Sequence, residues 1–321
     1  MQKRPTMTPT DKAPQVHPWG ERPNPFAMTI GSGRAFVLLV CVFVVCYLLT
    51  AATVYLVTKL LSGNEAAGLR IGAIVQDILL FVLPALATAL LASRRPAVLL
   101  GVTTPPGVVG IMLAIAILFV SVPAMEAVIY WNWHWDWLGP ELEAMARRME
   151  DSTAATLRLL MGNGSVMALV VNILIVGVAA GFAEELFFRG GMLRILLAGR
   201  INSHLAVWLV AVIFSALHFQ PFGLVPRILL GAYFGYLLLW SRSVWLPMFA
   251  HMLNNITYVV TAWSEVRREG AVALDKEPEL WSVYATVGSA VATAALIWIL
   301  FRHYRGDKTE LSGCRFGSTG Q

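Results

Sequence analysis

Long apolar runs are the feature that most constrains the fold of this chain. A bilayer core of about 30 Å is crossed by about 20 apolar residues in a helix, because an α-helix rises about 1.5 Å per residue. Eight candidate runs cover residues 35–60, 71–93, 107–130, 165–188, 203–219, 226–240, 243–262 and 281–301. The fifth and sixth are short, which is typical of helices that tilt little or re-enter the membrane. The sequence therefore predicts an all-α, polytopic membrane helix bundle of about eight transmembrane helices.

The composition agrees with a membrane protein. Hydrophobic residues make up 57% of the chain and charged residues 13%, whereas a soluble domain carries about 25% charged residues. The net charge of +5 would suggest nucleic-acid binding in a soluble protein, but here the basic residues lie mostly in short loops between apolar runs. We therefore predict a lipid bilayer environment and no nucleic-acid partner. Cys41, Cys46 and Cys314 have no ligand spacing, so neither a disulfide framework nor a structural zinc site is predicted.

The two ends of the chain differ from its apolar centre. Residues 1–33 are polar and proline-rich, and they lack an apolar core followed by a cleavage site. They are predicted to form a disordered cytoplasmic tail and not a signal peptide. The predicted transmembrane domain covers residues 34–302, and residues 303–321 are predicted to form a cytoplasmic C-terminal tail.

The orientation in the membrane is predicted from the basic residues. If both termini are cytoplasmic, fifteen of the 24 lysines and arginines fall on that side, Arg189 and Arg194 among them, and nine fall on the other side. Cytoplasmic loops carry the excess of basic residues, so the count favours cytoplasmic termini, in agreement with an even number of spans. The chain is therefore predicted to be an integral multi-pass protein of the plasma (inner) membrane.

A tryptophan-rich loop joins the third and fourth predicted spans. Tryptophans alternate over Trp131–Trp137, and Pro140 then opens a polar helix that reaches about Leu160. Alternating tryptophans are typical of a membrane interface, and the helix resembles one that lies on the membrane surface. Two roles stay open for it: an anchor for the two spans, or a gate over a substrate entrance.

Polar residues inside the predicted spans gather in three clusters. Ionisable groups cost several kcal/mol inside a membrane, so each needs a reason. The clusters are Glu184, Glu185 and Arg189 in GFAEELFFRGG, Phe214 and His218 in FSALH, and His251, Asn254 and Asn255 in HMLNN. The isolated residues Asp77, Glu126 and Asn172 are predicted to have helix-packing or interfacial roles.

Helical spacing separates the two glutamates. Glu185 and Arg189 are four residues apart on one helix face, with the acid first, which predicts a structural ion pair. Glu184 is rotated by about 100° from Glu185 and has no basic residue three or four positions away. A carboxylate without a local partner suits a general base, so Glu184 is the catalytic candidate.

Counting along the chain predicts that His218 lies close to Glu184. The only turn-like segment between them is Gly199–Ser203, centred on Ile201, and each of the two residues lies 17 positions from that centre. Two antiparallel helices joined there would hold both side chains at one depth, roughly 25 Å from the turn. That depth lies towards the face opposite the termini, whereas Arg189 and Arg194 count as cytoplasmic, so the face to which a site would open stays undecided.

His251 and Asn255 are four residues apart and share a helix face, whereas Asn254 points elsewhere. Their side chains can both donate hydrogen bonds to one developing oxyanion, which is the electrostatic task of peptide hydrolysis. A lone histidine in a membrane is often only a hydrogen-bonding residue between helices. Two adjacent glutamates with two histidines and an asparagine in separate spans favour a functional site.

The three clusters together resemble the signature of the CPBP family, the CAAX-processing and bacteriocin-processing intramembrane proteases, also called the Abi family. The resemblance covers residues 165–262. It implies a membrane metalloendopeptidase that hydrolyses a peptide bond of a membrane-associated protein or peptide, by CAAX-type, bacteriocin or propeptide processing. By the same resemblance, Glu184 and His218 would activate water, and His251 and Asn255 would stabilise the oxyanion.

The cofactor and the substrate stay open at this point. Glutamate with two histidines is a zinc-binding set, so Glu184, His218 and His251 are the predicted ligands if a metal is used, and a metal-free water is equally compatible. A prenylated substrate does not follow from the resemblance. Two rival functions are a non-catalytic immunity or scaffold protein that binds a membrane peptide, and a proton-coupled transporter. The transporter is disfavoured because paired inverted repeats are missing.

Overall fold

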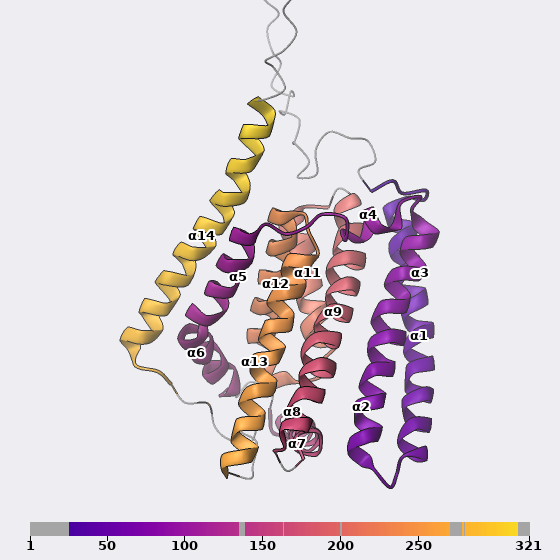
Figure 1. The fold of residues 1–321 in the computed structure, drawn as a ribbon, viewed down its shortest axis with the longest axis vertical. Coiled ribbons are helices and arrows are strands. Elements are labelled where there is room, and N and C mark those ends of the chain that lie inside the picture. The colour runs from indigo at the N-terminus through magenta and orange to yellow at the C-terminus, as the bar shows by residue number, and fades with distance from the viewer. Residues whose placement is uncertain are drawn as a thin grey trace, which may run out of the picture.

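The structure of the chain, a computed structural model, describes residues 26–134, 139–162, 164–199, 201–269, 278 and 280–313, with only the backbone of 306–313. These residues form helices and no strand, apart from one isolated antiparallel bridge between Met28 and Ser93. Figure 1 shows a bundle of long helices that run between two ends. The prediction of an all-α helix bundle is confirmed.

The first half of the bundle contains α1 (Ser32–Leu60), a continuous helix made of α2 (Glu65–Gln76), η1 (Asp77–Val82) and α3 (Leu83–Ala92), the short α4 (Pro96–Leu100), α5 (Val108–Val120), α6 (Val122–Trp133) and α7 (Gly139–Met161). The second half contains a continuous helix made of α8 (Val166–Asn172), η3 (Ile173–Ala179), α9 (Ala180–Glu185), η4 (Leu186–Leu193) and α10 (Arg194–Ala198), followed by α11 (Ser203–Ala216), η5 (Pro221–Gly223), α12 (Leu224–Ser241), α13 (Trp245–Glu269) and α14 (Val283–Gly313).

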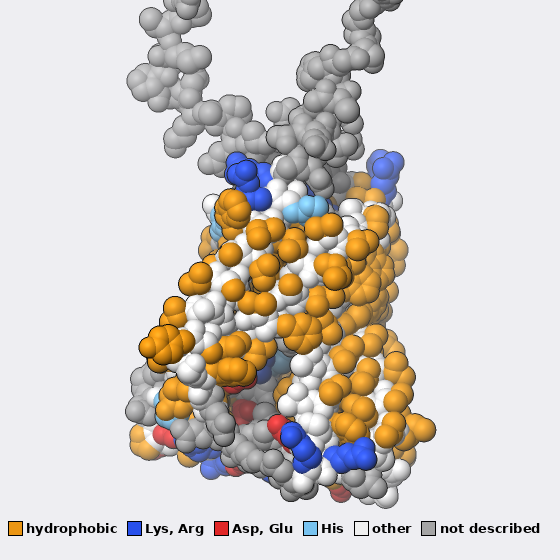
Figure 2. All heavy atoms as spheres, turned by 60° about the vertical axis from the view of Figure 1, so that its left-hand side comes forward, with side chains coloured by type: hydrophobic (Ala, Val, Ile, Leu, Met, Phe, Trp, Pro, Cys, Tyr) orange, Lys and Arg blue, Asp and Glu red, His pale blue; other side chains and the backbone are white. Residues whose placement is uncertain are grey.

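Within the described residues, five helices are long and apolar enough to cross a membrane, or up to six if the bent pair α5 and α6 forms one span. This pair is bent by 50° because Pro123, at the start of α6, removes a backbone donor. The predicted span at 203–219 is shorter than expected, since α11 ends at Ala216. Figure 2 shows a face that is apolar over most of its height, with charged side chains at both ends.

Glycines let the central helices approach closely. A Cβ atom on Gly177 or Gly181 would lie within 3.0 Å of atoms of α13, and one on Gly235 would lie 2.8 Å from Val207 of α11. A Cβ atom on Gly231 would lie 3.2 Å from Ala211 of α11. Small residues four apart permit this close contact between helices in membranes. Helices α9, α11, α12 and α13 therefore form the tightly packed centre of the bundle (Figure 1).

Helix α7 agrees with the polar helix predicted between Pro140 and Leu160. The Arg147 guanidinium lies 5.8 Å from the Trp133 ring of α6 and 5.2 Å from the Phe222 ring of η5. At the other end of α7, Arg70 donates to the Leu160 carbonyl at 2.7 Å. The helix is thereby held at both ends across the lower end of the bundle in Figure 1. Trp135 and Trp137 lie outside the described residues.

The structure corrects the predicted boundary at residue 33 and shows that the predicted C-terminal tail begins inside a helix. Residues 26–33, assigned to a disordered tail, pack against the bundle: Phe26 is buried, and Ser93 Oγ donates to its carbonyl at 2.8 Å. At the other end, α14 continues to Gly313, into the predicted tail 303–321. Both boundaries were placed by hydropathy, which registers neither a short segment with a single buried aromatic residue nor a helix that continues past its apolar part.

Two arginines counted as loop charges are buried inside the bundle. Arg189 is fully buried in the centre. Arg194 donates to the Leu99 and Val98 carbonyls at 2.5 and 2.8 Å, and so provides hydrogen bonds for two carbonyl groups in the last turn of α4. Asn172 has the predicted helix-packing role, because it donates to the Leu160 carbonyl at 2.7 Å. The described ends of the chain, at α1 and α14, lie at the end of the bundle opposite α7 (Figure 1).

Candidate active site

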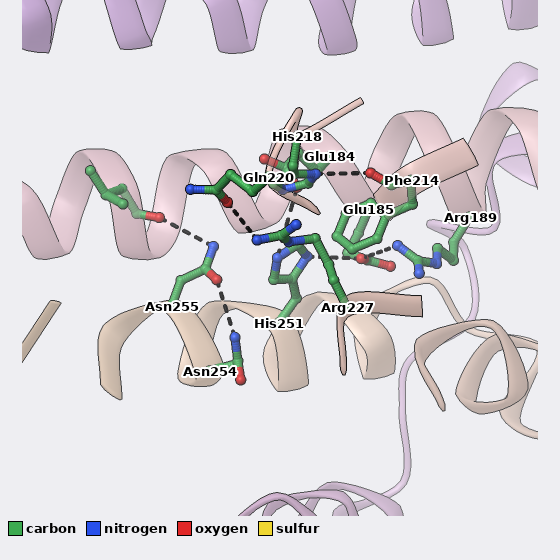
Figure 3. A network of polar contacts seen from close by, with 11 residues as sticks. Glu184, Glu185, Arg189, Phe214, His218, Gln220, Arg227, His251, Asn254 and Asn255 are labelled. Carbon is green, nitrogen blue, oxygen red and sulfur yellow. Dashed lines mark hydrogen bonds and ion pairs between the residues drawn. The ribbon is translucent and has the colours of Figure 1, made fainter. Parts of the chain in front are cut away.

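The three polar clusters meet in the centre of the bundle (Figure 3). The Glu184 Oε2 atom of α9 lies 4.0 Å from Nε2 of His218, in the turn after α11, and 3.8 Å from Nε2 of His251 on α13. Helix α10 ends at Ala198 and α11 begins at Ser203, so the predicted hairpin brings Glu184 and His218 to one depth. The side chains of His218 and Glu184 are 30% and 13% solvent-exposed, whereas that of His251 is 4% exposed.

Hydrogen bonds assign the orientation of both imidazoles. Nδ1 of His218 lies 2.8 Å from the Phe214 carbonyl, and Nδ1 of His251 lies 2.9 Å from Oε1 of Glu185. A carbonyl oxygen and a carboxylate oxygen are acceptors, so each Nδ1 is the donor. In the neutral imidazole, Nε2 then carries the lone pair. Both Nε2 atoms therefore face Glu184, as acceptors when the imidazole is neutral and as donors when it is protonated.

The predicted ion pair is present and fully buried. Arg189 Nη1 lies 2.5 Å from Glu185 Oε1, and its Nη2 donates to the Gly231 carbonyl of α12 at 2.8 Å. The guanidinium also lies 4.9 Å from the ring of Phe214 and 5.4 Å from that of Phe234. Helical spacing predicted the pair, but no sequence signal identified Gly231 or Phe234 as its partners.

Phe214 and Phe234 fix the histidines by ring contacts. The Phe214 ring meets His218 and His251 edge-on, with centroids 4.9 and 5.7 Å apart. Phe234 stacks on His251 at 4.9 Å. Aromatic contacts of this kind leave the imidazoles little freedom to rotate.

Asn255 lies one turn beyond His251 and faces η3. Its Nδ2 donates to the Val176 carbonyl at 3.3 Å, and its Oδ1 accepts from Asn254 Nδ2 at 3.4 Å. A carboxamide has two N–H groups, so one N–H of Asn255 stays available for a substrate oxygen. Asn254, which was predicted to point elsewhere, supports the Asn255 side chain.

Asn132 of α6 holds the turn that carries His218, and sequence reasoning did not identify it. This buried side chain donates to the Pro221 carbonyl at 3.0 Å and accepts from the Val225 amide at 2.8 Å. In the same turn, Phe219 adopts a φ of +52°, which is uncommon for a residue with a side chain. A polar residue within the tryptophan-rich run was the only available sequence signal for Asn132.

Two cavities flank the site. One of about 410 Å³ lies between α7 and the turn after α11; its lining includes Met145, Arg148, Ser152 and His218. The other, of about 320 Å³, is almost entirely apolar and is lined by Asp77, Phe182, Ala183 and Met252, among others. Asp77 is buried there, and its Oδ2 has no hydrogen-bond partner among the described residues.

The predicted metal ligands have suitable chemistry but not suitable spacing. Histidines that bind zinc through Nε2 donate their Nδ1 hydrogen to another group, as His218 and His251 do. Ligands about 2.0–2.1 Å from a tetrahedral zinc lie roughly 3.4 Å apart, which is closer than Glu184 lies to either imidazole. Within the described part of the chain, no three His, Cys, Asp or Glu side chains could hold a metal ion. As placed, these residues do not fit a metal.

Comparison with known proteins identifies the segment that carries the site. Residues 166–257 match the family model described as type II CAAX prenyl endopeptidase Rce1-like. This segment contains Glu184, His218, His251 and Asn255, and the match confirms the resemblance to CAAX-processing proteases. No curated protein and no solved structure matches the chain.

Proposed function

We propose that this chain, in which residues 166–257 form an Rce1-like domain, is an intramembrane endopeptidase that hydrolyses a peptide bond of a membrane-associated protein or peptide. One observation carries the proposal: the Nε2 atoms of His218 and His251 converge on Glu184 within 4.0 Å, while other acceptors hold both Nδ1 atoms. A packing role alone does not require a carboxyl group and two imidazole nitrogens that face one another without hydrogen bonds.

The first step is the activation of water. Glu184 takes one proton from the water molecule, and Nε2 of His218 accepts a hydrogen bond from the remaining O–H group and so orients the oxygen. The oxygen then forms a bond to the carbonyl carbon of the substrate. General acid–base catalysis of this kind contributes about 10²–10⁴-fold to a rate. The partial exposure of Glu184 and His218 supports access of water to them.

The second requirement is a site for the negative charge that forms on the carbonyl oxygen. The free N–H of Asn255 and an Nε2 proton on His251 would donate to this oxygen. Glu185, at 2.9 Å from Nδ1, would stabilise the positive imidazolium. When the tetrahedral intermediate collapses, the carbonyl re-forms, the C–N bond breaks, and Glu184 gives its proton to the leaving nitrogen.

The proposed reaction uses no metal ion. The spacing of Glu184 from His218 and His251, 4.0 and 3.8 Å, supports a water molecule between these groups better than a metal bound to all three. Glu184 therefore acts as a base and not as a ligand.

The two cavities support a route for the substrate. The cavity beside α7 leads to His218, and the apolar cavity is suited to an apolar part of a CAAX-type or propeptide substrate. The buried Arg189 and Arg194 and the site residue Arg227 do not report on the orientation of loops. When they are left out of the count, thirteen basic residues remain on the side of the termini and eight on the other side. We therefore propose cytoplasmic termini and a site that opens at the α7 end, on the opposite face.

The proposal is tested by comparing the wild-type chain with Glu184→Gln in its host membrane. New peptide termini that depend on the chain are identified by mass spectrometry, and substrates retained by Glu184→Gln are captured with it. We expect cleavage products only with the wild-type chain, and uncleaved precursors bound to the variant. Equal amounts of each product with both proteins, at equal expression and thermal stability, would contradict the peptidase assignment.

A further inference from the structure

Arg227 is a cation at the site that the reaction described above does not use. It lies in the first turn of α12, and Figure 3 shows its guanidinium in the middle of the polar network. It interacts electrostatically with both Glu184 and His218. A positive charge thus belongs to the polar network that contains the carboxylate and the imidazole proposed to activate water.

The guanidinium of Arg227 is only partly satisfied. Its Nη2 donates to Oε1 of Gln220 at 2.5 Å, and its Nη1 is buried without a hydrogen-bond partner among the described residues. Gly223 leaves room for it, since a Cβ atom there would lie 2.8 Å from Nη2. Gln220 and Gly223, both in the turn that carries His218, therefore set the position of Arg227.

Among the described residues, the buried Arg189 and Arg194 each have two hydrogen-bond acceptors, whereas the half-buried Arg227 has one. Arg189 has the carboxylate of Glu185, and Arg194 has two carbonyl oxygens at the end of α4. Arg227 has one neutral amide, and no carboxylate within ion-pair distance in the described part of the chain. A buried N–H group of a cation is costly to leave without an acceptor, so the buried Nη1 of Arg227 favours a further partner.

Glu150 of α7 is the alternative partner. It interacts electrostatically with Arg227, but the two form no ion pair among the described residues, and Glu150 Oε2 is itself buried without a hydrogen-bond partner. Direct pairing with Glu150 would make Arg227 a structural link between α7 and α12. The tests below separate this role from a role in substrate binding.

We infer that Arg227 binds an anionic oxygen of the substrate through its free Nη1, and that Gln220 is the positioning residue that holds the guanidinium. Glu184 Oε2 is also buried without a hydrogen-bond partner among the described residues, so a substrate oxygen that reaches both groups would meet a base on one side and a cation on the other. Two sources share this chemistry: the oxyanion of the tetrahedral intermediate, which Arg227 would then stabilise together with Asn255 and His251, and a carboxylate close to the cleaved bond. Both rest on the proposed peptidase function.

The test uses the full-length protein in detergent and a substrate peptide identified by the Glu184→Gln capture experiment. The peptide is prepared with its carboxylates free and with them amidated. If Arg227 binds the oxyanion, Arg227→Gln lowers kcat by about 10²–10³-fold for both peptides and leaves KM nearly unchanged. If it binds a substrate carboxylate, the variant raises KM at least about 30-fold for the free acid only. Cleavage of both peptides at the wild-type rate would overturn the inference.

Three further variants complete the test. Arg268→Gln removes an exposed arginine from the α7 end of α13 and is expected to leave both constants unchanged. Gln220→Ala should change the same kinetic constant as Arg227→Gln, but by a smaller factor. Arg227→Lys keeps the charge, so its value of that constant should lie between those of the wild-type chain and Arg227→Gln. If Glu150→Gln reproduces the loss seen with Arg227→Gln, the arginine is a structural partner of Glu150 and the inference is wrong.

The outcome for Arg227 is distinguishable from the outcome for the proposed function. If Glu184→Gln cleaves the peptide as the wild-type chain does, the peptidase mechanism fails whatever Arg227 does. If Glu184→Gln is inactive and Arg227→Gln is fully active, only the role of Arg227 fails. Thermal unfolding of each variant in detergent shows that the compared proteins are folded, and Arg227→Lys supplies the result if Arg227→Gln does not fold.

Discussion

Nδ1 of His251 lies 2.9 Å from Oε1 of Glu185, the same oxygen that Arg189 contacts at 2.5 Å. The pair between Glu185 and Arg189 therefore does more than neutralise two buried charges. It fixes the imidazole of His251 with Nε2 towards Glu184. One oxygen atom of Glu185 therefore both pairs with Arg189 and positions His251. Helical spacing had assigned Glu185 a structural role only and Glu184 the catalytic role.

Removing the charge of each glutamate in turn should give different results. Glu184→Gln should lower turnover by about 10²–10⁴-fold, because it removes the base. It should leave the melting temperature nearly unchanged, since no ion pair is lost. Glu185→Gln should lower both stability and turnover, because Arg189 loses its counter-charge and His251 its carboxylate. Thermal unfolding in detergent and a cleavage assay measure both, and equal losses of stability would contradict this division.

The buried ion pair should behave as a coupled unit. Arg189→Met leaves Glu185 as an unpaired buried charge, which should cost about 3–5 kcal/mol of stability. The double variant Glu185→Gln/Arg189→Met removes both charges and should unfold at a higher temperature than Arg189→Met alone. Strictly additive losses in the three variants would show that the two charges do not stabilise each other.

The close approach of α9 to α13 should be required for the site. A methyl group at Gly181 would lie 3.0 Å from the backbone nitrogen of Met252, so Gly181→Ala should push α13 outward at a cost of about 1–3 kcal/mol and lower turnover by displacing His251. Gly191→Ala, in the same continuous helix, is the matched control because its methyl group would meet only atoms 3.8 Å away or more. Equal thermal stability of the two variants would contradict this packing role.

Asn255→Asp tests the oxyanion role against a metal site. A carboxylate at this position would face both the Val176 carbonyl and the developing oxyanion, so Asn255→Asp should be at least as inactive as Asn255→Ala. Asn255→Ala should lower turnover by about 10²–10³-fold with substrate affinity nearly intact. We also expect much less than one metal ion per purified chain by elemental analysis. An active Asn255→Asp variant with stoichiometric zinc would overturn the metal-free reaction and leave the peptidase assignment standing.

The face to which the site opens is tested by labelling single cysteines. In a background in which Cys41, Cys46 and Cys314 are alanine, Ser152→Cys places a thiol on the exposed face of α7, and Thr103→Cys places one at the opposite end of the bundle. A membrane-impermeant maleimide should label Ser152→Cys in intact cells and Thr103→Cys only after permeabilisation. The reverse pattern would place the termini outside and the site on the cytoplasmic face.

The sequence by itself determined the features that depend on local repetition. Apolar runs of sufficient length have no stable form in a bilayer other than helices that satisfy their own backbone. The spacing of four residues placed Arg189 one turn from Glu185, and equal distances from a turn placed His218 at the depth of Glu184. Each of these relationships follows from the rise and the period of one helix or one hairpin.

Only the tertiary structure decided the contacts between helices that are distant in the sequence. These include the bond between His251 and Glu185 and the clamp of Asn132 on the turn after α11. They also include the unpartnered Nη1 of Arg227 beside that turn. In a membrane protein, lipid-facing and protein-facing surfaces are both apolar, so hydropathy does not reveal which helices meet or how each is rotated. Small residues such as Gly181 set these distances, and the polar side chains of the site follow from them.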